Sequence, residues 1–277
     1  MNTAQVILYT FAGRRANMEL LQPYVRRILD RNPNVRWEIW NLARVPEDAA
    51  YLQTIQGDRI TVRNDCYNPD QWWASLSSVW DKYASDEYAG TIFVKTDDDI
   101  AFLESDRFSE LVDAAADNPD SVISALTVNN GASTPLIPGI NEGFERLGIP
   151  RLGVHMSNAY ADMCHEWFAE SWGDLVGAAG ERVPTSDWVS INVIAYTAGV
   201  GKKLASLIGQ QSPPHISGRD WPPGSIIGDE GACNMLPRII TTGFVAAHLT
   251  FGPQHCSERQ QAAWRARYAE IAREYLA

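Results

Sequence analysis

The chain has 277 residues, of which 45% are hydrophobic and 21% charged, and its formal net charge is -11. Such a composition predicts a globular protein long enough to bury a core and excludes a mainly disordered chain. The negative charge argues against a broad basic surface for nucleic acid. The arginines that crowd the first and last helical regions leave two interpretations, a local basic groove or, more simply, solvated helix faces.

The cysteines and the start of the sequence bear on the compartment. The four cysteines are widely spaced and form no CxxC pair, so they indicate neither a zinc knuckle nor a disulfide framework. The opening stretch MNTAQVILYTFAG lacks the basic and long apolar regions of a signal peptide and is typical of a first strand. No window approaches the roughly 20 apolar residues of a membrane span. We therefore expect a cytoplasmic protein with no membrane partner.

Strand and helix patterns alternate through the first half of the chain. Apolar, β-rich runs predict strands at 5–10, 35–41, 59–64, 91–96 and 121–128. Helical patterns follow the first strand up to residue 29 and recur at 71–84 and 105–116. Asp70 is expected to cap the second of these helices, whose apolar stripe includes Trp72 and Trp73. This alternation predicts a mostly parallel sheet flanked by helices, which binds ligands at the carboxyl ends of its strands.

The second half has a different rhythm. The stretch 129–153 is rich in Gly and Pro and predicts a long functional loop, and a second such segment covers 210–231. Helical patterns follow at 157–172 and 186–196, and 238–252 is typical of a late strand. The last helix begins at Ser257, which resembles a capping box together with Gln260.

Three consecutive carboxylates, Asp97, Asp98 and Asp99, follow directly after the predicted strand 91–96. Their mutual repulsion is unfavourable unless a cation lies among them. In an extended segment Asp97 and Asp99 share one face and Asp98 points away. Two carboxylates on one face can hold Mg²⁺ or Mn²⁺ and leave positions open for phosphates. The sequence disfavours a calcium loop, because the glycine and the distant glutamate of such a loop are missing, and an acidic surface turn is the simpler alternative.

With this cluster the sequence resembles the GT-A glycosyltransferases, which carry a DxD signature at the end of a strand in a Rossmann-like sheet. Here the signature reads Asp97-Asp98-Asp99. The resemblance implies that one aspartate of the cluster contacts the ribose or sugar of a nucleotide-diphosphate sugar. Asp97 and Asp98 are our candidates for this contact. It also implies that Asp97 and Asp99 hold Mn²⁺ or Mg²⁺ on the diphosphate, and that His248, after the run VAA, is a further metal ligand. A single histidine is otherwise more often structural.

The stretch GDEGACNMLPR resembles the acidic pair that GT-A enzymes carry near the acceptor site. In inverting members of the family one of these acids is the general base. The order here is Asp229-Glu230, so the base stays open between the two. A general base must lie within hydrogen-bond reach of the acceptor hydroxyl. The simpler alternative is an acidic pair at the start of a helix, where negative charge is favourable anyway.

The stretch after the first strand fits the family loop that holds the nucleotide, and it contains Thr10, Phe11, Ala12, Gly13 and Arg14. Gly13 permits close backbone approach, and Arg14 or Arg15 could pair with a diphosphate. Asp65 is our candidate for a base or ribose contact. Lys95 either reaches the phosphates or has a structural role within its strand.

His155 and Asp187 lie in the half that the resemblance assigns to the acceptor, and Trp221 lies in a later loop where it is harder to bury. For Asp187 the alternative is a helix N-cap, and Trp221 could stack on a sugar ring or a base. The resemblance implies one GT-A domain, with a nucleotide-sugar half at 1–128, an acceptor half at 129–252 and a C-terminal helix at 253–277. The C-terminal part would thus form an acceptor-side subregion.

The sequence is most similar to compact bacteriophage enzymes of this family, including those beside TET-like oxygenases that glycosylate hydroxymethylated pyrimidines in phage DNA. The expected activity is metal-dependent, inverting sugar transfer, with a UDP-sugar favoured as donor, in the host cytoplasm if the chain is phage-encoded. A virion protein or a glycan is the alternative acceptor. A nucleotidyltransferase would need a better Gly-rich basic signature than TFAGRRAN, and a catalytically silent sugar-nucleotide binder is the further alternative.

Overall fold

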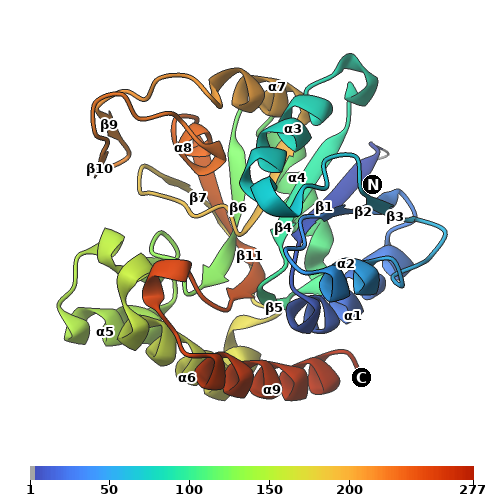
Figure 1. The fold of residues 1–277 in the computed structure, drawn as a ribbon. Helices are drawn as coiled ribbons and strands as arrows, with labels where there is room; N and C mark the ends of the chain where they lie inside the picture. Colours follow the sequence, from blue (N-terminus) through green and yellow to red (C-terminus); the bar gives the residue numbers. More distant parts are fainter. Residues whose placement is uncertain (1–3) are drawn as a thin grey trace.

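The computed structural model describes residues 4–277, with the side chains of residues 72–75 outside the described part. The chain forms a large mixed sheet flanked by helices (Figure 1). The strands of this sheet are β1 (Val6–Ala12), β2 (Val35–Asn41), β3 (Ile60–Arg63), β4 (Ile92–Asp97), β5 (Ile100–Leu103), β6 (Val122–Val128), β7 (Arg182–Thr185), β8 (Val193–Thr197) and β11 (Arg238–His248). Their order is β3-β2-β1-β4-β8-β6-β11-β5, and β7 pairs with β11.

The helices cover both faces of the sheet. They are α1 (Arg15–Arg31), α2 (Pro46–Leu52), α3 (Trp72–Tyr83), α4 (Phe108–Asp117), α5 (Pro138–Leu147), α6 (Asn158–Leu175), α7 (Ala198–Leu207), α8 (Asp229–Asn234) and α9 (Glu258–Tyr275). One apolar cluster joins the sheet to α1, α4, α6 and α9, and a second joins it to α3, α7 and α8. Among the helices of the described residues, none is long and apolar enough to cross a membrane.

Strand β1 shows how the sequence builds these two clusters. Val6 and Leu8 belong to the first cluster, whereas Ile7 and Tyr9 belong to the second, because successive side chains of a strand point to opposite faces. Since each such side chain is fully buried, it contributes about 1.5–3 kcal/mol to folding. The hydroxyl of Tyr9 lies 2.7 Å from that of Tyr196 on β8, so its polar end is satisfied inside the core.

The direction of the strands confirms part of the predicted sheet and corrects the rest. Strands β1, β2, β3 and β4 are parallel, as expected, and so are β6 and β11. The prediction of a mostly parallel sheet is wrong for the second half, because β8 runs antiparallel between β4 and β6, and β11 is antiparallel to β5 and β7. The segment 186–192 brings the chain to the carboxyl edge of β4, so β8 has to run back from it.

Strand β11 contains an irregularity that matters for the site. Its pairing with β6 passes from Thr241 opposite Ala125 to Val245 opposite Leu126, so residues 242–244 bulge out of the ladder. Beyond the bulge the strand also pairs with β5, and its last residue, His248, lies opposite Ile100. The strand therefore ends next to the acidic cluster.

Two of the element predictions for the second half are wrong. The stretch 129–153, predicted as a loop, contains α5, with Pro138 in its first turn and Gly148 as a left-handed C-cap. The stretch 186–196, predicted as a helix that Asp187 could cap, contains the strand β8. Its β-branched pair Val193-Ile194 prefers a strand, and the fully buried position in the sheet decides the outcome.

The cap of α3 also differs from the prediction. The N-cap position of α3 is Gln71 rather than Asp70, and the side chain of Gln71 makes no capping hydrogen bond among the described residues. In the 3₁₀ turn that precedes α3, the side-chain oxygen of Asn68 accepts from the backbone N–H groups of Asp70 and Gln71, at 3.2 Å each. Of the predicted apolar stripe, Trp80 is buried, whereas the side chains of Trp72 and Trp73 lie outside the described residues.

The C-terminal helix α9 is confirmed. The hydroxyl of Ser257 accepts from the backbone N–H of Gln260 at 3.2 Å, which is one half of the predicted capping box. The side chain of Gln260 instead donates to Asn158 and Asp162 of α6. These contacts fix α9 against α6, and α9 also packs on α1.

Candidate functional site

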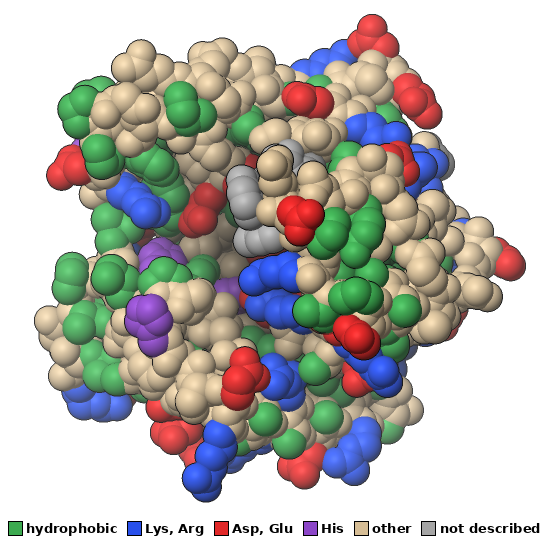
Figure 2. Space-filling model, viewed as in Figure 1, with side chains coloured by type: hydrophobic (Ala, Val, Ile, Leu, Met, Phe, Trp, Pro, Cys, Tyr) green, Lys and Arg blue, Asp and Glu red, His purple; other side chains and the backbone are tan. Residues whose placement is uncertain are grey.

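A cavity of about 270 Å³ lies at the carboxyl ends of β1, β2 and β4. Its wall is made by Phe11, Gly13, Arg14, Leu42, Arg44, Leu76, Lys95, Asp97, Asp98, Asp99, Ile191, Asp229 and Glu230. Figure 2 shows this face of the molecule hollowed near its centre, with cationic, anionic and histidine side chains around the hollow. The cavity therefore brings together the acidic cluster, the loop after β1 and the acidic pair of the second half.

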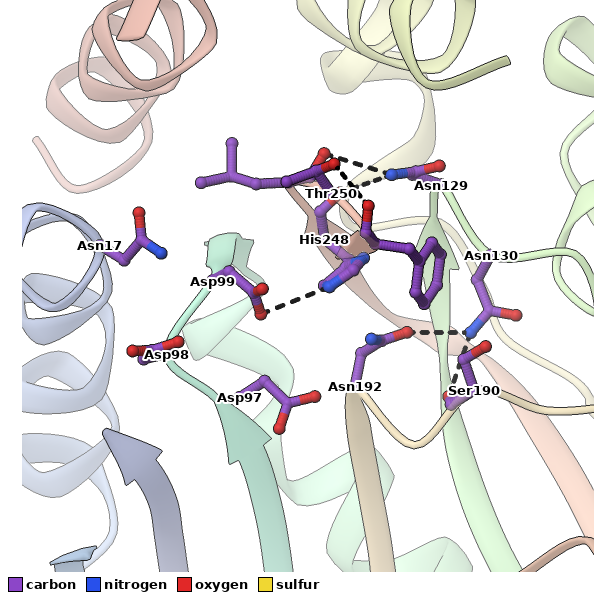
Figure 3. A network of polar contacts seen from close by, with 12 residues as sticks. Asn17, Asp97, Asp98, Asp99, Asn129, Asn130, Ser190, Asn192, His248 and Thr250 are labelled. Carbon is purple, nitrogen blue, oxygen red and sulfur yellow. Dashed lines mark hydrogen bonds and ion pairs between the residues drawn. The ribbon is translucent and has the colours of Figure 1, made fainter. Parts of the chain in front are cut away.

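The acidic cluster is a turn between two strands. Strand β4 ends at Asp97 and β5 begins at Ile100, so Asp98 and Asp99 form the turn, and the assumed extended conformation stops at Asp97. In Figure 3 the carboxylates of Asp97 and Asp99 nevertheless face the same space, while Asp98 lies on the side of the neighbouring helix. The predicted common side of Asp97 and Asp99 is found, but a turn produces it.

The loop after β1 binds two of these carboxylates. The backbone N–H of Gly13 donates to Asp98 at 2.8 Å, and the Nε atom of Arg14 lies 3.0 Å from the same carboxylate. The Nη2 atom of Arg14 contacts both Asp98 and Asp99, the latter at 2.8 Å. A Cβ atom on Gly13 would lie 3.0 Å from the backbone oxygen of Leu42, so the loop fits closely here.

These contacts set the protonation of the turn. Burial lowers the pKa of Arg14, but the charges of Asp99 and Asp98 outweigh it and raise that pKa. For Asp99, burial raises the pKa, and the stronger effect of Arg14 and His248 holds it below its usual value. For Asp98 the burial effect prevails over Arg14, so its pKa is raised. Asp99 is the carboxylate that stays charged most readily.

Asp97 has its own cation. The ammonium group of Lys95, whose side chain is only 2% exposed, donates to Asp97 at 2.6 Å and to the backbone oxygen of Ile191 at 2.7 Å. Burial raises the pKa of Asp97 to about 6, against the opposing effect of Lys95. Lys95 thus lines the cavity, and its charge balances Asp97 in this structure.

His248 lies next to the turn, at the end of β11. Its Nε2 atom is 3.3 Å from Oδ1 of Asp99, and the side chains of both residues are almost fully buried. Within the described part of the chain, neither Oδ1 of Asp99 nor Nδ1 of His248 has a hydrogen-bond partner. A buried acceptor without a partner is costly and calls for an explanation.

A metal ion is one explanation, and the donor set fits it in part. Carboxylate oxygen and imidazole nitrogen are ligands that Mn²⁺ accepts, and Mg²⁺ sites on phosphates use only one or two protein carboxylates. Figure 3 shows Asp97, Asp99 and His248 around one space. Residues 4–277, as far as they are described, contain no group of three or more His, Cys, Asp and Glu side chains close enough to hold a metal.

The acidic pair of the second half starts the short helix α8 on another wall of the cavity. Asp229 accepts from the backbone N–H of Glu230 at 2.8 Å and from the indole of Trp80 at 3.4 Å. Glu230 accepts from the indole of Trp188 at 2.5 Å. Burial raises the pKa of Glu230, while the Trp188 hydrogen bond lowers it by a smaller amount. A carboxylate with a raised pKa is better matched to proton abstraction at neutral pH.

Some predicted donor-site residues lie behind or beside the cavity. The hydroxyl of Thr10 is buried in the core, 2.7 Å from that of Thr96, and Ala12 is fully buried. Asp65 is about half exposed and pairs with Lys82 at 3.0 Å, away from the lining residues. Of the loop 10–14, only Phe11, Gly13 and Arg14 reach the cavity wall.

The acceptor-side candidates are placed differently from one another. His155 contacts the hydroxyl of Ser190 at 2.7 Å, and its ring lies 4.6 Å from that of Phe251, which also packs on His248. Burial lowers the pKa of His155 to about 4, so this imidazole is neutral at pH 7. Asp187 pairs with Arg151 at the surface, outside the cavity wall.

Several site residues carried no clear sequence signal. Arg44 and Leu42 line the cavity after β2, and Asn130 and Asn192 bond to each other at 3.3 Å near the cluster (Figure 3). The pair Asn129-Asn130 directly follows a buried strand, which is a usable signal for the same sheet edge. Trp188 and Arg219 come together only in the folded chain and could not be paired from the sequence.

Comparison of the chain with known proteins gives no further identification. No protein-family model matches it, and no curated protein matches it either.

Proposed function

We propose that the protein is a metal-dependent glycosyltransferase that moves a sugar from a nucleotide-diphosphate sugar to an acceptor hydroxyl. The observation that carries this proposal is the composition of one cavity. The cluster Asp97-Asp98-Asp99 and the loop of Arg14 form one wall, and Glu230 forms another. A donor with a diphosphate and an acceptor with a hydroxyl would need these two groups of side chains on opposite sides of the reacting carbon.

The donor is proposed to lie over the loop after β1. Phe11, Leu42 and Leu76 offer apolar surface for a nucleotide base, and Arg14 and Arg44 are the cations for the diphosphate. A UDP-sugar remains the favoured donor. Because Arg14 is held by two aspartates in this structure, binding of the diphosphate would compete with that ion pair.

Asp99 and His248, with Asp97, would hold Mn²⁺ or Mg²⁺, which when bound supplies positive charge to the departing diphosphate. The unsatisfied oxygen of Asp99 supports this assignment. Asp98 is proposed to orient the loop through Gly13 and Arg14, which leaves it without a direct ligand role.

Glu230 is proposed as the general base. Its carboxylate lies on the cavity wall, is oriented by the indole of Trp188 and has a raised pKa. Asp229 is engaged by the start of its own helix, so we assign it the supporting role. In the proposed step Glu230 takes the proton of the acceptor hydroxyl, whose oxygen forms the new bond at the anomeric carbon as the bond to the diphosphate breaks. Attack from the side opposite the leaving group inverts that carbon.

A hydroxymethylated pyrimidine in phage DNA is the proposed acceptor, on resemblance, and a virion protein or glycan is the alternative. The test of the donor chemistry comes first. The protein is incubated with UDP, GDP, CMP and dTDP sugars, each with Mn²⁺ and with a chelator, and its melting temperature is recorded. A metal-dependent rise with one nucleotide supports the proposal and selects the donor for transfer assays. If no donor raises the melting temperature and none is consumed, the proposal fails.

A catalytically silent sugar-nucleotide binder is the second candidate. The observation in its favour is that Arg14 and Lys95 already neutralise the aspartates that a metal would need. A donor that binds equally well with and without Mn²⁺, and is neither hydrolysed nor transferred, would favour this candidate.

A further inference from the structure

The hairpin of residues 211–227 presents an arginine next to the proposed base. Its strands are β9 (His215–Ile216) and β10 (Arg219–Asp220), and the turn between them is Ser217-Gly218. The guanidinium of Arg219 lies over the ring of Trp188 at 4.9 Å and over that of Trp221 at 5.2 Å. Trp188 is the residue whose indole donates to Glu230. One indole therefore separates Arg219 from the carboxylate of the cavity wall.

The position of Arg219 is built into the fold. Ser217 and Gly218 both have positive φ, at 46° and 79°, which is the turn geometry of a tight hairpin. The hydroxyl of Ser217 donates to the backbone oxygen of Asn234 at 2.9 Å and accepts from the buried Arg238 at 2.9 Å. These bonds tie the tip of the hairpin to the end of α8. Arg219, the next residue, is thus placed on the same side of the molecule as Glu230.

Arg219 is an exposed residue. No carboxylate lies within ion-pair distance of its guanidinium among the described residues, and the neighbouring Asp220 is paired with His215 at 2.9 Å. By contrast, two of the cavity cations, Arg14 and Lys95, are paired with aspartates. A guanidinium stacked on rings keeps its in-plane N–H donors free for an oxyanion, which it can bind with two parallel hydrogen bonds.

The surroundings agree with this use. Burial raises the pKa of Glu230 and lowers that of His155, and the charge of Arg219 lowers both by a smaller amount, so its guanidinium lies near both side chains. The indole N–H of Trp221 is also without a hydrogen-bond partner in the described chain. Because this N–H is buried, the indole would have to shift before it could donate to an incoming oxygen.

We infer that Arg219, held on Trp188 and Trp221, binds an oxyanion of the acceptor, so that the acceptor carries a phosphate or a carboxylate near the hydroxyl that receives the sugar. This inference rests on the proposed function, because that function is what makes the bound molecule the acceptor of the sugar. It deepens that function by adding a charge requirement, which the cavity residues alone do not impose.

The test measures binding with matched charged and neutral probes. Dissociation constants are measured by calorimetry for thymidine 5′-monophosphate against thymidine and for glucuronate against glucose, with UDP and Mn²⁺ present to fill the donor side. The variants are Arg219→Gln, Arg219→Lys and, as a control, Arg182→Gln, which removes an exposed arginine of β7 whose side chain pairs with Asp117 of α4. The pair of probes in which the charged member binds more tightly shows whether the oxyanion of the acceptor is a phosphate or a carboxylate.

We expect the charged probe of one pair to bind the wild-type protein more tightly than its neutral partner. Arg219→Gln should weaken that charged probe by about 10- to 100-fold and leave the neutral probe unchanged, because a charge-assisted contact is lost. Arg219→Lys should fall in between, since it keeps the charge but loses the fork. Arg182→Gln should behave as wild type.

Two results would overturn the inference, namely equal binding of the charged probe by wild type and Arg219→Gln, or no charge preference by wild type in either pair. The proposed function fails separately. If wild type does not bind UDP with Mn²⁺, the donor site is absent whatever Arg219 binds. If UDP binds both proteins equally and only the charged probe is lost in Arg219→Gln, both proposals stand.

Discussion

The Nε2 atom of His248 lies 3.3 Å from Oδ1 of Asp99, and that oxygen has no hydrogen bond within the described chain. The two residues come from the two halves of the sequence, one from the turn after β4 and one from the end of β11. A strand bulge and a chain reversal are needed to bring them together. This contact is the point at which the proposed metal site can be tested directly.

Replacing Asp99 by Asn should weaken Mn²⁺ binding in the presence of UDP by at least about tenfold. Removing a residue that only hydrogen-bonds to a metal ligand typically costs about 10–100-fold in metal affinity, and loss of a ligand itself should cost no less. The measurement is the electron paramagnetic resonance signal of free Mn²⁺ during titration. Asp187→Asn is the matched control, because Asp187 is an exposed aspartate paired with Arg151 away from the cavity. Unchanged Mn²⁺ affinity in Asp99→Asn would remove Asp99 from the ligand set.

Replacing Arg14 by Gln should destabilise the metal-free protein, because Asp98 and Asp99 then face each other without their shared cation. The expected loss is about 1–2 kcal/mol of unfolding free energy, reduced from the cost of a fully buried pair because Arg14 is 44% exposed. Urea denaturation with and without Mn²⁺ and UDP measures it.

The matched control is Arg15→Gln, which removes the neighbouring exposed arginine and should leave the unfolding free energy unchanged. Mn²⁺ without UDP should restore more stability to Arg14→Gln than to wild type, since the added cation replaces the missing one. Equal stability of Arg14→Gln and wild type would show that the aspartates need no counter-cation.

Replacing Glu230 by Gln should lower kcat by about 10²–10⁴-fold with donor binding retained, because a general base contributes roughly that factor. Asp229→Asn is the comparison variant and should have the smaller effect, as its carboxylate is engaged by the N-terminus of α8. Steady-state kinetics and UDP titration give the two quantities. If Asp229→Asn is the more severe variant, the assignment of the base has to be exchanged.

Replacing Trp188 by Phe should move the acidic limb of the pH–rate profile to higher pH. The base must be deprotonated to act, and its pKa is already raised by burial. The Trp188 hydrogen bond stabilises the charged carboxylate and lowers that pKa, so its removal raises the pKa further. The profile of kcat/KM from pH 4 to 8 measures the shift, and a shift to lower pH would contradict the assigned role.

The buried His165 should make the fold sensitive to acid. Burial lowers its pKa to about 4 from 6.5, and both ring nitrogens are bonded, to the Tyr268 hydroxyl and the Leu249 backbone oxygen. The unfolded chain therefore binds more protons between these values, and stability falls as the pH decreases from 6.5 towards 4. At pH 5 this single group should cost about 2 kcal/mol relative to pH 7.

Denaturation of wild type and His165→Gln at pH 7 and pH 5 tests this account. The loss between the two pH values should be smaller in the variant, whatever its stability at pH 7. An equal loss in both proteins would mean that His165 is not the responsible group.

The first half of the fold is predictable because its signals are local. Strand 35–41 is found as predicted, and Asp97 ends the next parallel strand, so the position of the cluster at the carboxyl edge follows from periodicity. The second half of the fold is less predictable from the sequence. Helix α5 has Gly and Pro at its ends, which the composition of 129–153 hides, and β8 is set by two neighbouring strands that its own sequence does not reveal.

The candidate site is likewise predictable in part. The candidates Asp97, Asp99, Asp229, Glu230 and His248 lie at or beside one cavity, as the proposed motifs require. What no motif could give is the pairing of side chains: Arg14 with Asp98 and Asp99, Trp188 with Glu230, and Arg219 with Trp188. These pairs depend on tertiary contacts between distant segments, so only coordinates can supply them.

Because of the bulge at residues 242–244, the number of residues in β11 decides which side chain lies next to the acidic cluster. Side chains alternate along a strand, so deleting one residue from the bulge would turn every later side chain to the opposite face. His248 would then take the place of Ala247, opposite Phe102, and Leu249 would take its place next to Asp99. Homologues with a different number of residues between Thr241 and Val245 should therefore have lost this histidine or moved it by one position.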